Sequence, residues 1–195
     1  MHQKKIAIYG STGSIGKQTL EVISAHPDLF TAEILTAYSN DALLIEQALQ
    51  FIPNIVVIGD ITKYANVKKA LEGKPIKVFA GEEALEQVAG MDCYDFMMAG
   101  IVGFAGLKPT LTAVRNGKTI GLANKETLVV AGDIVMREAK ENKANIIPVD
   151  SEHSAIFQCL VGEAHNPIEK IILTASGGPF LGKKPNFLVN VKRDH

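Results

Sequence analysis

The amino-acid sequence predicts an α/β protein whose core is a doubly wound, mostly parallel β-sheet, followed by the beginning of an α+β domain. Short apolar segments alternate with longer segments of helical periodicity as far as residue 150, which is typical of a parallel sheet with helices on both faces. A glycine-rich turn over residues 10–16 directly follows the first apolar segment. Such a turn lets a helix start close to a strand end, and its position predicts a Rossmann-like fold.

The predicted strands are short apolar runs, several of which are bounded by glycine or proline. The first ends at Gly10 and the third begins after Pro53. Asp41 is expected to cap the second helix, and Gly117 is suited to the left-handed position that closes a later one. The expected strands cover residues 5–9, 30–38, 54–58, 77–79, 94–99, 118–122 and 144–149, and the expected helices cover residues 15–25, 41–51, 62–71, 82–89, 107–116 and 126–140.

The alternation stops at residue 150, where we place a domain boundary. Residues 1–150 form the first domain, and residues 151–195 form the start of a second, incomplete domain. In this second part the sequence predicts a helix over residues 154–160, a strand over residues 170–174 and then a glycine-rich turn. Residues 181–195 carry many charges and no long apolar pattern, so we do not expect this segment to pack by itself.

The composition is that of an ordinary globular chain and excludes several functional classes. A formal net charge of −1 and a pI near 6.5 provide no basic surface for nucleic acid or for an anionic membrane. No apolar run reaches the roughly 20 residues that a membrane helix needs. Cys93 and Cys159 lack metal-site spacing, and the N-terminus leads directly into a strand without a signal-peptide pattern. We therefore expect a cytoplasmic protein.

The glycines of the first turn have the spacing G-x-x-G-x-x-G, a variant of the dinucleotide-binding pattern. Gly10 permits the tight turn, Gly13 lets the backbone approach a pyrophosphate, and Gly16 lets the helix pack against the strand. Amides at the N-terminus of that helix favour a bound anion. A plain strand-to-helix turn is the alternative, but the position of the turn after the first strand favours a dinucleotide site.

The end of the second predicted strand bears on which dinucleotide binds. An NAD site usually places a carboxylate there to bond the ribose hydroxyls. This sequence offers Ser39 and Asn40 instead, with no carboxylate before Asp41. A 2′-phosphate would meet hydroxyl and amide groups without repulsion, which favours NADPH, although Arg and Lys are also missing at this point. In the alternative interpretation, Ser39 and Asn40 only cap the next helix.

Two carboxylates, Asp150 and Glu152, follow the last strand of the first domain and are separated by one residue. In an extended segment both side chains would project to the same side, where a divalent cation could take an oxygen from each. Mg²⁺ or Mn²⁺ suits these ligands better than zinc does, since no Cys/His cluster accompanies them. Alternatively, the pair marks the start of a helix and only complements its dipole.

Lys125 lies between Asn124 and Glu126 at another strand-to-helix junction. Open parallel sheets bind ligands at this edge, where a lysine can hold an oxyanion or a phosphate; a plain surface lysine is the alternative. Ser176, which two glycines follow, could belong to an anion-binding nest or merely to a turn. His153 could act as a base, although a histidine in the first turn of a helix is more often structural.

Taken together, these motifs resemble the N-terminal portion of 1-deoxy-D-xylulose 5-phosphate reductoisomerase. The resemblance runs through essentially the whole chain in order, and its most specific segments are Ala-Asn-Lys-Glu and Val-Asp-Ser-Glu-His. The matching segments are residues 10–16, 99–103, 122–126, 148–153, 155–158 and 176–180.

The resemblance implies that residues 1–150 bind NADPH and that residues 151–195 begin the catalytic domain, which binds metal and substrate. It implies Asp150 and Glu152 as two of three carboxylate ligands of Mg²⁺ or Mn²⁺, and Lys125 and Glu152 as catalytic residues. The residues implied in cofactor binding are Gly10, Thr12, Gly13, Ser14, Ile15, Gly16, Ser39, Asn40, Gly100, Ile101, Asn124 and Glu126, and those implied in substrate binding are Lys125, Ser151, Glu152 and Ser176.

The family reaction rearranges the carbon skeleton of 1-deoxy-D-xylulose 5-phosphate and reduces the resulting aldehyde with NADPH. Its product, 2-C-methyl-D-erythritol 4-phosphate, is a precursor in non-mevalonate isoprenoid synthesis. The resemblance thus implies a homodimeric enzyme that acts on a small phosphorylated sugar.

Two features depart from the family pattern. Many members carry a basic residue where this sequence has Ser39, and members are considerably longer than this chain. The additional part would hold the third metal carboxylate, a lid, most phosphate ligands and a C-terminal helical domain, so we expect this chain alone to be catalytically incomplete. The alternatives are an NADP-dependent dehydrogenase without isomerase chemistry and a non-catalytic nucleotide-binding fragment.

Overall fold

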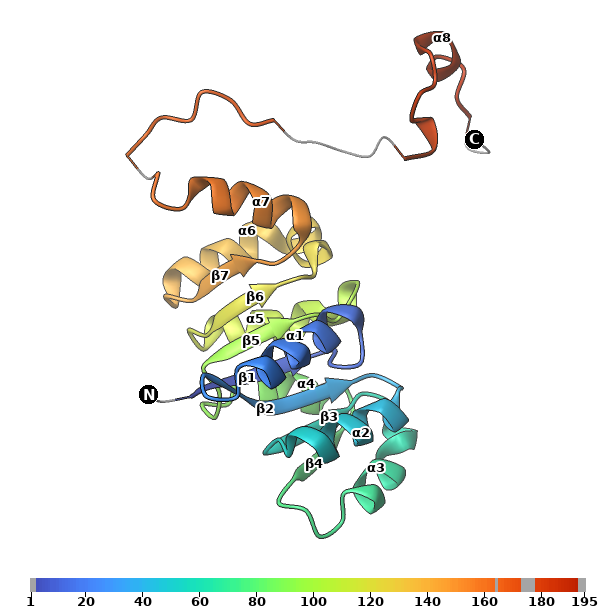
Figure 1. Ribbon diagram of the computed structural model, residues 1–195, viewed down its shortest axis with the longest axis vertical. Helices are drawn as coiled ribbons and strands as arrows, with labels where there is room; N and C mark the ends of the chain where they lie inside the picture. The colour runs from blue at the N-terminus through green and yellow to red at the C-terminus, as the bar shows by residue number, and fades with distance from the viewer. Residues whose placement is uncertain (1–2, 164, 173–177, 193–195) are drawn as a thin grey trace. The chain divides into compact units, whose positions relative to one another are not determined.

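A computed structural model describes the chain over residues 3–163, 165–172 and 178–192. The chain divides into two compact units, Met1–Asp150 and Ser151–His195 (Figure 1). Within the described residues, all fully buried side chains belong to the first unit. The part of the second unit that the structure describes contains short helices and no strand.

The first unit is built on a seven-stranded sheet with the order β4-β3-β2-β1-β5-β6-β7. Every pair of neighbouring strands runs parallel, so the prediction of a mostly parallel, Rossmann-like sheet is confirmed (Figure 1). In the centre, Ile6, Ala7, Ile8 and Tyr9 are all buried, as expected for a strand that is covered on both faces. The strands are β1 (Lys4–Tyr9), β2 (Phe30–Ala37), β3 (Ile55–Ile58), β4 (Lys77–Ala80), β5 (Phe96–Ala99), β6 (Thr119–Leu122) and β7 (Asn145–Pro148).

Helices cover both faces of the sheet, as the sequence predicted. Successive strand residues alternate between two apolar clusters: Ile8 packs with the helices of one face, whereas Ala7 and Tyr9 pack with those of the other. The first face carries α1 (Ser14–Ala25), α2 (Asp41–Phe51) and α3 (Tyr64–Ala70), and the second carries α4 (Glu82–Ala89), α5 (Leu107–Arg115) and α6 (Lys125–Glu141).

The direction of the strand order reverses at β1, which pairs with β2 on one side and with β5 on the other. The loops after these strands therefore diverge and leave a crevice beyond their carboxyl ends. Glycines allow the backbone to pack tightly there: a Cβ on Gly10 would lie 3.0 Å from the Gly100 carbonyl oxygen, and one on Gly16 would lie 2.3 Å from the Gly10 carbonyl oxygen. Gly10 also has a φ of 87°, which favours glycine.

Several boundaries in the first unit differ from the sequence prediction. Asn40, rather than Asp41, caps α2, because its Oδ1 accepts a hydrogen bond from the Leu43 amide at 3.2 Å. The helix expected from residue 126 begins at Lys125 and is interrupted by the non-helical backbone of Ala131. Short 3-10 turns, η1 (Ile61–Lys63) and η2 (Phe104–Gly106), precede α3 and α5.

The second unit contains α7 (Ser151–Leu160), η3 (Gly178–Phe180) and α8 (Pro185–Leu188) in its described part. α7 begins at Ser151 and not at residue 154. The strand expected over residues 170–174 is wrong for residues 170–172, which form no strand, and its other residues lie outside the described part. A strand needs a hydrogen-bonding neighbour, and the described residues after Asp150 provide none. No helix in the described ranges combines the length and apolar character needed to cross a membrane.

Candidate active site

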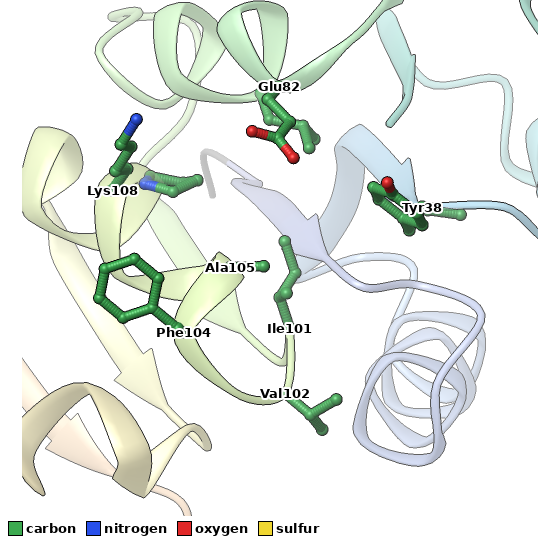
Figure 2. A pocket seen from close by; sticks show the side chains of 10 residues that line it. Tyr38, Glu82, Ile101, Val102, Phe104, Ala105 and Lys108 are labelled. Atoms are coloured by element: carbon green, nitrogen blue, oxygen red, sulfur yellow. The ribbon is translucent and has the colours of Figure 1, made fainter. Parts of the chain in front are cut away.

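The predicted site residues of the first unit follow the strands β1, β2, β5, β6 and β7, and parallel strands end at a common edge of the sheet. A cavity of about 530 Å³ lies at this edge, between the loop after β5 and the end of β2 (Figure 2). It is lined by Ala37, Tyr38, Glu82, Leu85, Ile101, Val102, Phe104, Ala105, Lys108 and Pro109.

The walls of this cavity are mainly apolar, with charged side chains at one side. Figure 2 shows the Tyr38 ring facing Ile101 across the cavity, while Glu82 enters from the N-terminus of α4. Lys108, near the start of α5, adds a positive charge. Such a slot fits a flat group with polar edges, for example a nucleotide base.

The first part of the glycine loop is fixed by buried hydrogen bonds that sequence reasoning missed. The Gly10 amide donates to the Thr36 hydroxyl at 3.0 Å, and the Ser11 amide donates to the Thr36 carbonyl at 2.8 Å. The Ser11 hydroxyl donates to Gln47 Oε1 at 2.7 Å, and Gln47 Nε2 donates to the Ser11 carbonyl at 2.9 Å. Ser11, Thr36 and Gln47 are all buried, so β2 and α2 hold the loop from two directions.

The second part of the loop faces outward. α1 begins at Ser14, and its cap residue, Gly13, has no side chain that could bond the first-turn amides. Gly13 and Ser14 are exposed, and Thr12 and Ile15 are half-buried. The helix N-terminus therefore presents backbone amides to a ligand, which suits a phosphate or pyrophosphate.

At the end of β2, Asn40 can cap the next helix and still face a ligand. Asn40 caps α2, and both Asn40 and Ser39 are exposed. The next carboxylate, Asp41, accepts a hydrogen bond from Asn66 at 2.6 Å and pairs with Lys63 at 3.4 Å. The Asn66 amide and then the Lys63 ammonium lower the pKa of Asp41. This carboxylate is thus bound to groups of η1 and α3.

Lys125 and Asp150 are brought together from the ends of β6 and β7. Lys125 Nζ lies 3.3 Å from Asp150 Oδ2, and the Asp150 side chain is only 16% exposed. Asn124 is buried directly before α6, whereas Glu126 is exposed in its first turn. Gly100 and Ile101 form the start of the loop that lines the cavity.

The geometry expected for the acidic pair is corrected by the structure. The segment is not extended, because α7 begins at Ser151 and places Glu152 in its first turn. Ser151 and His153 belong to the same turn, and Ser176 lies outside the described residues. No group of three or more His, Cys, Asp or Glu side chains suited to a metal ion occurs within the described ranges.

Family comparisons account for both units. Residues 6–132 match the family model of 1-deoxy-D-xylulose 5-phosphate reductoisomerase, and residues 146–195 match that of the C-terminal domain of the same enzyme. The chain belongs to the 1-deoxy-D-xylulose 5-phosphate reductoisomerase family.

Curated reductoisomerases are similar over most of this chain. The enzyme of Bacteroides fragilis is 56% identical over 178 residues, which is 91% of this chain and 46% of the relative. That of Clostridium perfringens is 52% identical and is covered to 47% of its length. The chain therefore spans just under half the length of the curated reductoisomerases that it matches.

Solved reductoisomerase structures agree with the fold. A Zymomonas mobilis reductoisomerase in complex with NADPH is 40% identical, with a TM-score of 0.90, covering 98% of this chain and 50% of that one. A reductoisomerase in complex with NADPH, fosmidomycin and magnesium is 38% identical, with a TM-score of 0.85, covering 97% of this chain and 49% of that one.

Replacing Gln47 by Met should loosen the glycine loop while nearly preserving side-chain volume. Both buried hydrogen bonds to Ser11 are lost, so we expect the free energy of unfolding to fall by about 1–3 kcal/mol. Amide hydrogen exchange of residues 10–16 should become faster. Gln50→Met, at an exposed position of the same helix, should change stability by less than about 0.5 kcal/mol. Equal denaturation curves for the two variants would contradict the role of Gln47.

Proposed function

We propose that this chain is the cofactor-binding part of a reductoisomerase that converts 1-deoxy-D-xylulose 5-phosphate to 2-C-methyl-D-erythritol 4-phosphate with NADPH and a divalent metal ion. The observation that carries the proposal is the glycine-lined crevice at the β1 switch point, on the same sheet edge as Lys125 and Asp150. Family membership supports the substrate and product, since the curated relatives bear this enzyme name.

The crevice offers a separate place for each part of a dinucleotide. The amides at the N-terminus of α1 would bind the pyrophosphate, with Thr12, Gly13, Ser14 and Ile15 as the contact residues. The apolar cavity beside Tyr38 and Ile101 would take the adenine. Exposed Ser39 and Asn40 would then lie near the 2′-phosphate. Solved relatives in complex with NADPH support this assignment.

Lys125 and Asp150 suit the binding of the substrate and of the metal ion. Asp150 Oδ2 lies 3.3 Å from the Lys125 ammonium, so the carboxylate and the lysine meet at the same edge of the sheet. Asp150 and Glu152 would hold Mg²⁺ or Mn²⁺, which supplies Lewis-acid polarisation of substrate oxygens when bound. Lys125 would hold the substrate in position by its charge, and Ser151 and Ser176 would add hydroxyl donors. Solved relatives that contain magnesium support the metal assignment.

The assembly and location of the whole protein are part of the same proposal. A homodimer, a cytoplasmic location and the absence of nucleic-acid or membrane partners stay predictions. The solved relative with bound fosmidomycin and NADPH supports a small-molecule substrate next to the cofactor.

NADPH should bind to this chain more tightly than NADH. No carboxylate ends β2, and the nearest one, Asp41, is bound by Asn66 and Lys63, so a 2′-phosphate meets little repulsion. Fluorescence titration of the 195-residue chain with both cofactors measures the two dissociation constants. Gly13→Val should weaken the binding of both cofactors, because the valine side chain would block the approach of the pyrophosphate to the backbone. Equal affinities for the two cofactors, or a preference for NADH, would contradict the proposal that the end of β2 lies near the 2′-phosphate.

The chain alone should show no reductoisomerase turnover, even with NADPH and Mn²⁺. Two carboxylates leave a divalent ion mostly hydrated and weakly held. Positioning and electrostatic stabilisation normally supply several kcal/mol each, and the relatives devote more than half of their length to additional chain. A steady-state assay of NADPH oxidation in the presence of 1-deoxy-D-xylulose 5-phosphate measures the turnover of the isolated chain.

In a full-length protein that contains this segment, Glu152→Gln should abolish turnover while leaving NADPH affinity nearly unchanged. Loss of a carboxylate ligand weakens the metal and not the dinucleotide. Measurable turnover by the isolated chain would contradict the prediction that it is catalytically incomplete, and full activity of the Glu152→Gln enzyme would contradict the metal assignment.

A further inference from the structure

The side chain of Asn124 joins two parts of the sheet edge. It lies between the end of β6 and the start of α6 and is only 2% exposed. Asn124 Nδ2 donates hydrogen bonds to the Ile101 carbonyl and, at 2.8 Å, to the Gly103 carbonyl. Asn124 Oδ1 accepts a hydrogen bond from the Thr127 amide at 3.1 Å. Both amide hydrogens are therefore used within the protein.

One end of this amide holds the wall of the cavity. Residues 101–106 form the loop after β5, and Ile101, Val102, Phe104 and Ala105 line the cavity. Ile101 packs against the apolar core, but the following residues have less apolar support, since Val102 is 82% exposed and Phe104 is 65% exposed. The contact is close: a Cβ at Gly106 would lie 2.6 Å from Asn124 Nδ2.

The other end of the amide sets the start of α6. Asn124 is the cap residue of this helix, and the first helical residue is Lys125. Lys125 in turn pairs with Asp150 at 3.3 Å. A continuous path of contacts therefore runs from the cavity wall through Asn124 to the lysine at the other end of the site.

We propose that Asn124 is a positioning residue: its side chain holds the loop of residues 101–106 and the N-terminus of α6 in one geometry, so that the cofactor pocket is formed before the cofactor arrives. This inference rests on the proposed function for the identity of the cofactor. It adds a structural role for the Asn124 side chain to the cofactor contact that the family resemblance implies for this residue.

Asn124→Asp separates the two tasks of the amide. The carboxylate keeps the shape of the side chain and still accepts the Thr127 amide as a helix cap, a position where Asp is favoured. The substitution removes both N–H donors, and a carboxylate oxygen in their place would repel the Ile101 and Gly103 carbonyl oxygens. Asn142→Asp is the matched control at the other end of α6, where Asn142 Nδ2 donates to the Glu138 carbonyl at 2.9 Å.

Two measurements on the 195-residue chain test the proposal. Hydrogen exchange of the cofactor-free Asn124→Asp protein should be faster in residues 101–106, while the Thr127 amide stays protected. The dissociation constant for NADPH, titrated below the melting temperature, should rise by about tenfold. Asn142→Asp should lower the melting temperature and leave both the loop exchange and the NADPH affinity unchanged.

Other outcomes overturn the proposal. Unchanged exchange in residues 101–106 together with weaker NADPH binding would leave direct contact with the cofactor as the only role of Asn124. Faster exchange with unchanged affinity would show that the loop does not form the pocket. If Asn124→Asp unfolds below the titration temperature, Asn124→Ser, which also keeps an acceptor and removes the amide donors, replaces it in both measurements. Failure of the unaltered chain to bind NADPH would overturn the proposed function. The exchange data would still decide whether Asn124 holds the loop of residues 101–106.

Discussion

The close approach of three backbone segments at the carboxyl end of β1 is the constraint on which the rest of the structure depends. A Cβ on Gly16 would overlap the Gly10 carbonyl oxygen at 2.3 Å, and one on Gly100 would lie 3.1 Å from the Tyr9 carbonyl oxygen. Because these positions carry no side chain, α1 starts directly beside β1, and the loop after β5 crosses next to it. The first-turn amides of α1 consequently remain open to an anion. A bulkier residue would move α1 away from the sheet and disturb this crevice.

Buried amides hold the two loops that flank this point. Gln47 reaches the glycine loop from α2, and Asn124 reaches the loop after β5 from the junction with α6. Each amide bonds backbone carbonyls of the loop that it reaches. A loop that is ordered before the ligand arrives reduces the entropy lost on binding. The same junction carries Lys125, which pairs with Asp150, so the cofactor crevice and the charged end of the site share one support.

The sheet and its helices could be predicted because burial on both faces produces apolar runs with a clear alternation of strands and helices. The Ser11–Gln47 pair could not, since the two residues are 36 positions apart and no local pattern marks them. Asn40 and Asp41 are both good cap residues, so only the backbone distinguishes them. The start of α7 decides the conformation around Glu152, and the strand expected after residue 170 depends on a neighbour that the described residues lack. The roles of individual site residues stay predictions.

The central claim is that the carboxyl edge of the sheet, at β1, binds the dinucleotide. A hydrogen-exchange footprint of the chain with and without saturating NADPH tests it most directly. The competing surface is an open hollow of about 670 Å³ beside α3 and β4, which includes Lys68, Lys69, Lys74 and Lys77 and could attract phosphates by charge alone. We expect protection in residues 12–15 and 101–105 and none in residues 64–79. Protection confined to residues 64–79, or binding without protection of the glycine loop, would contradict the account.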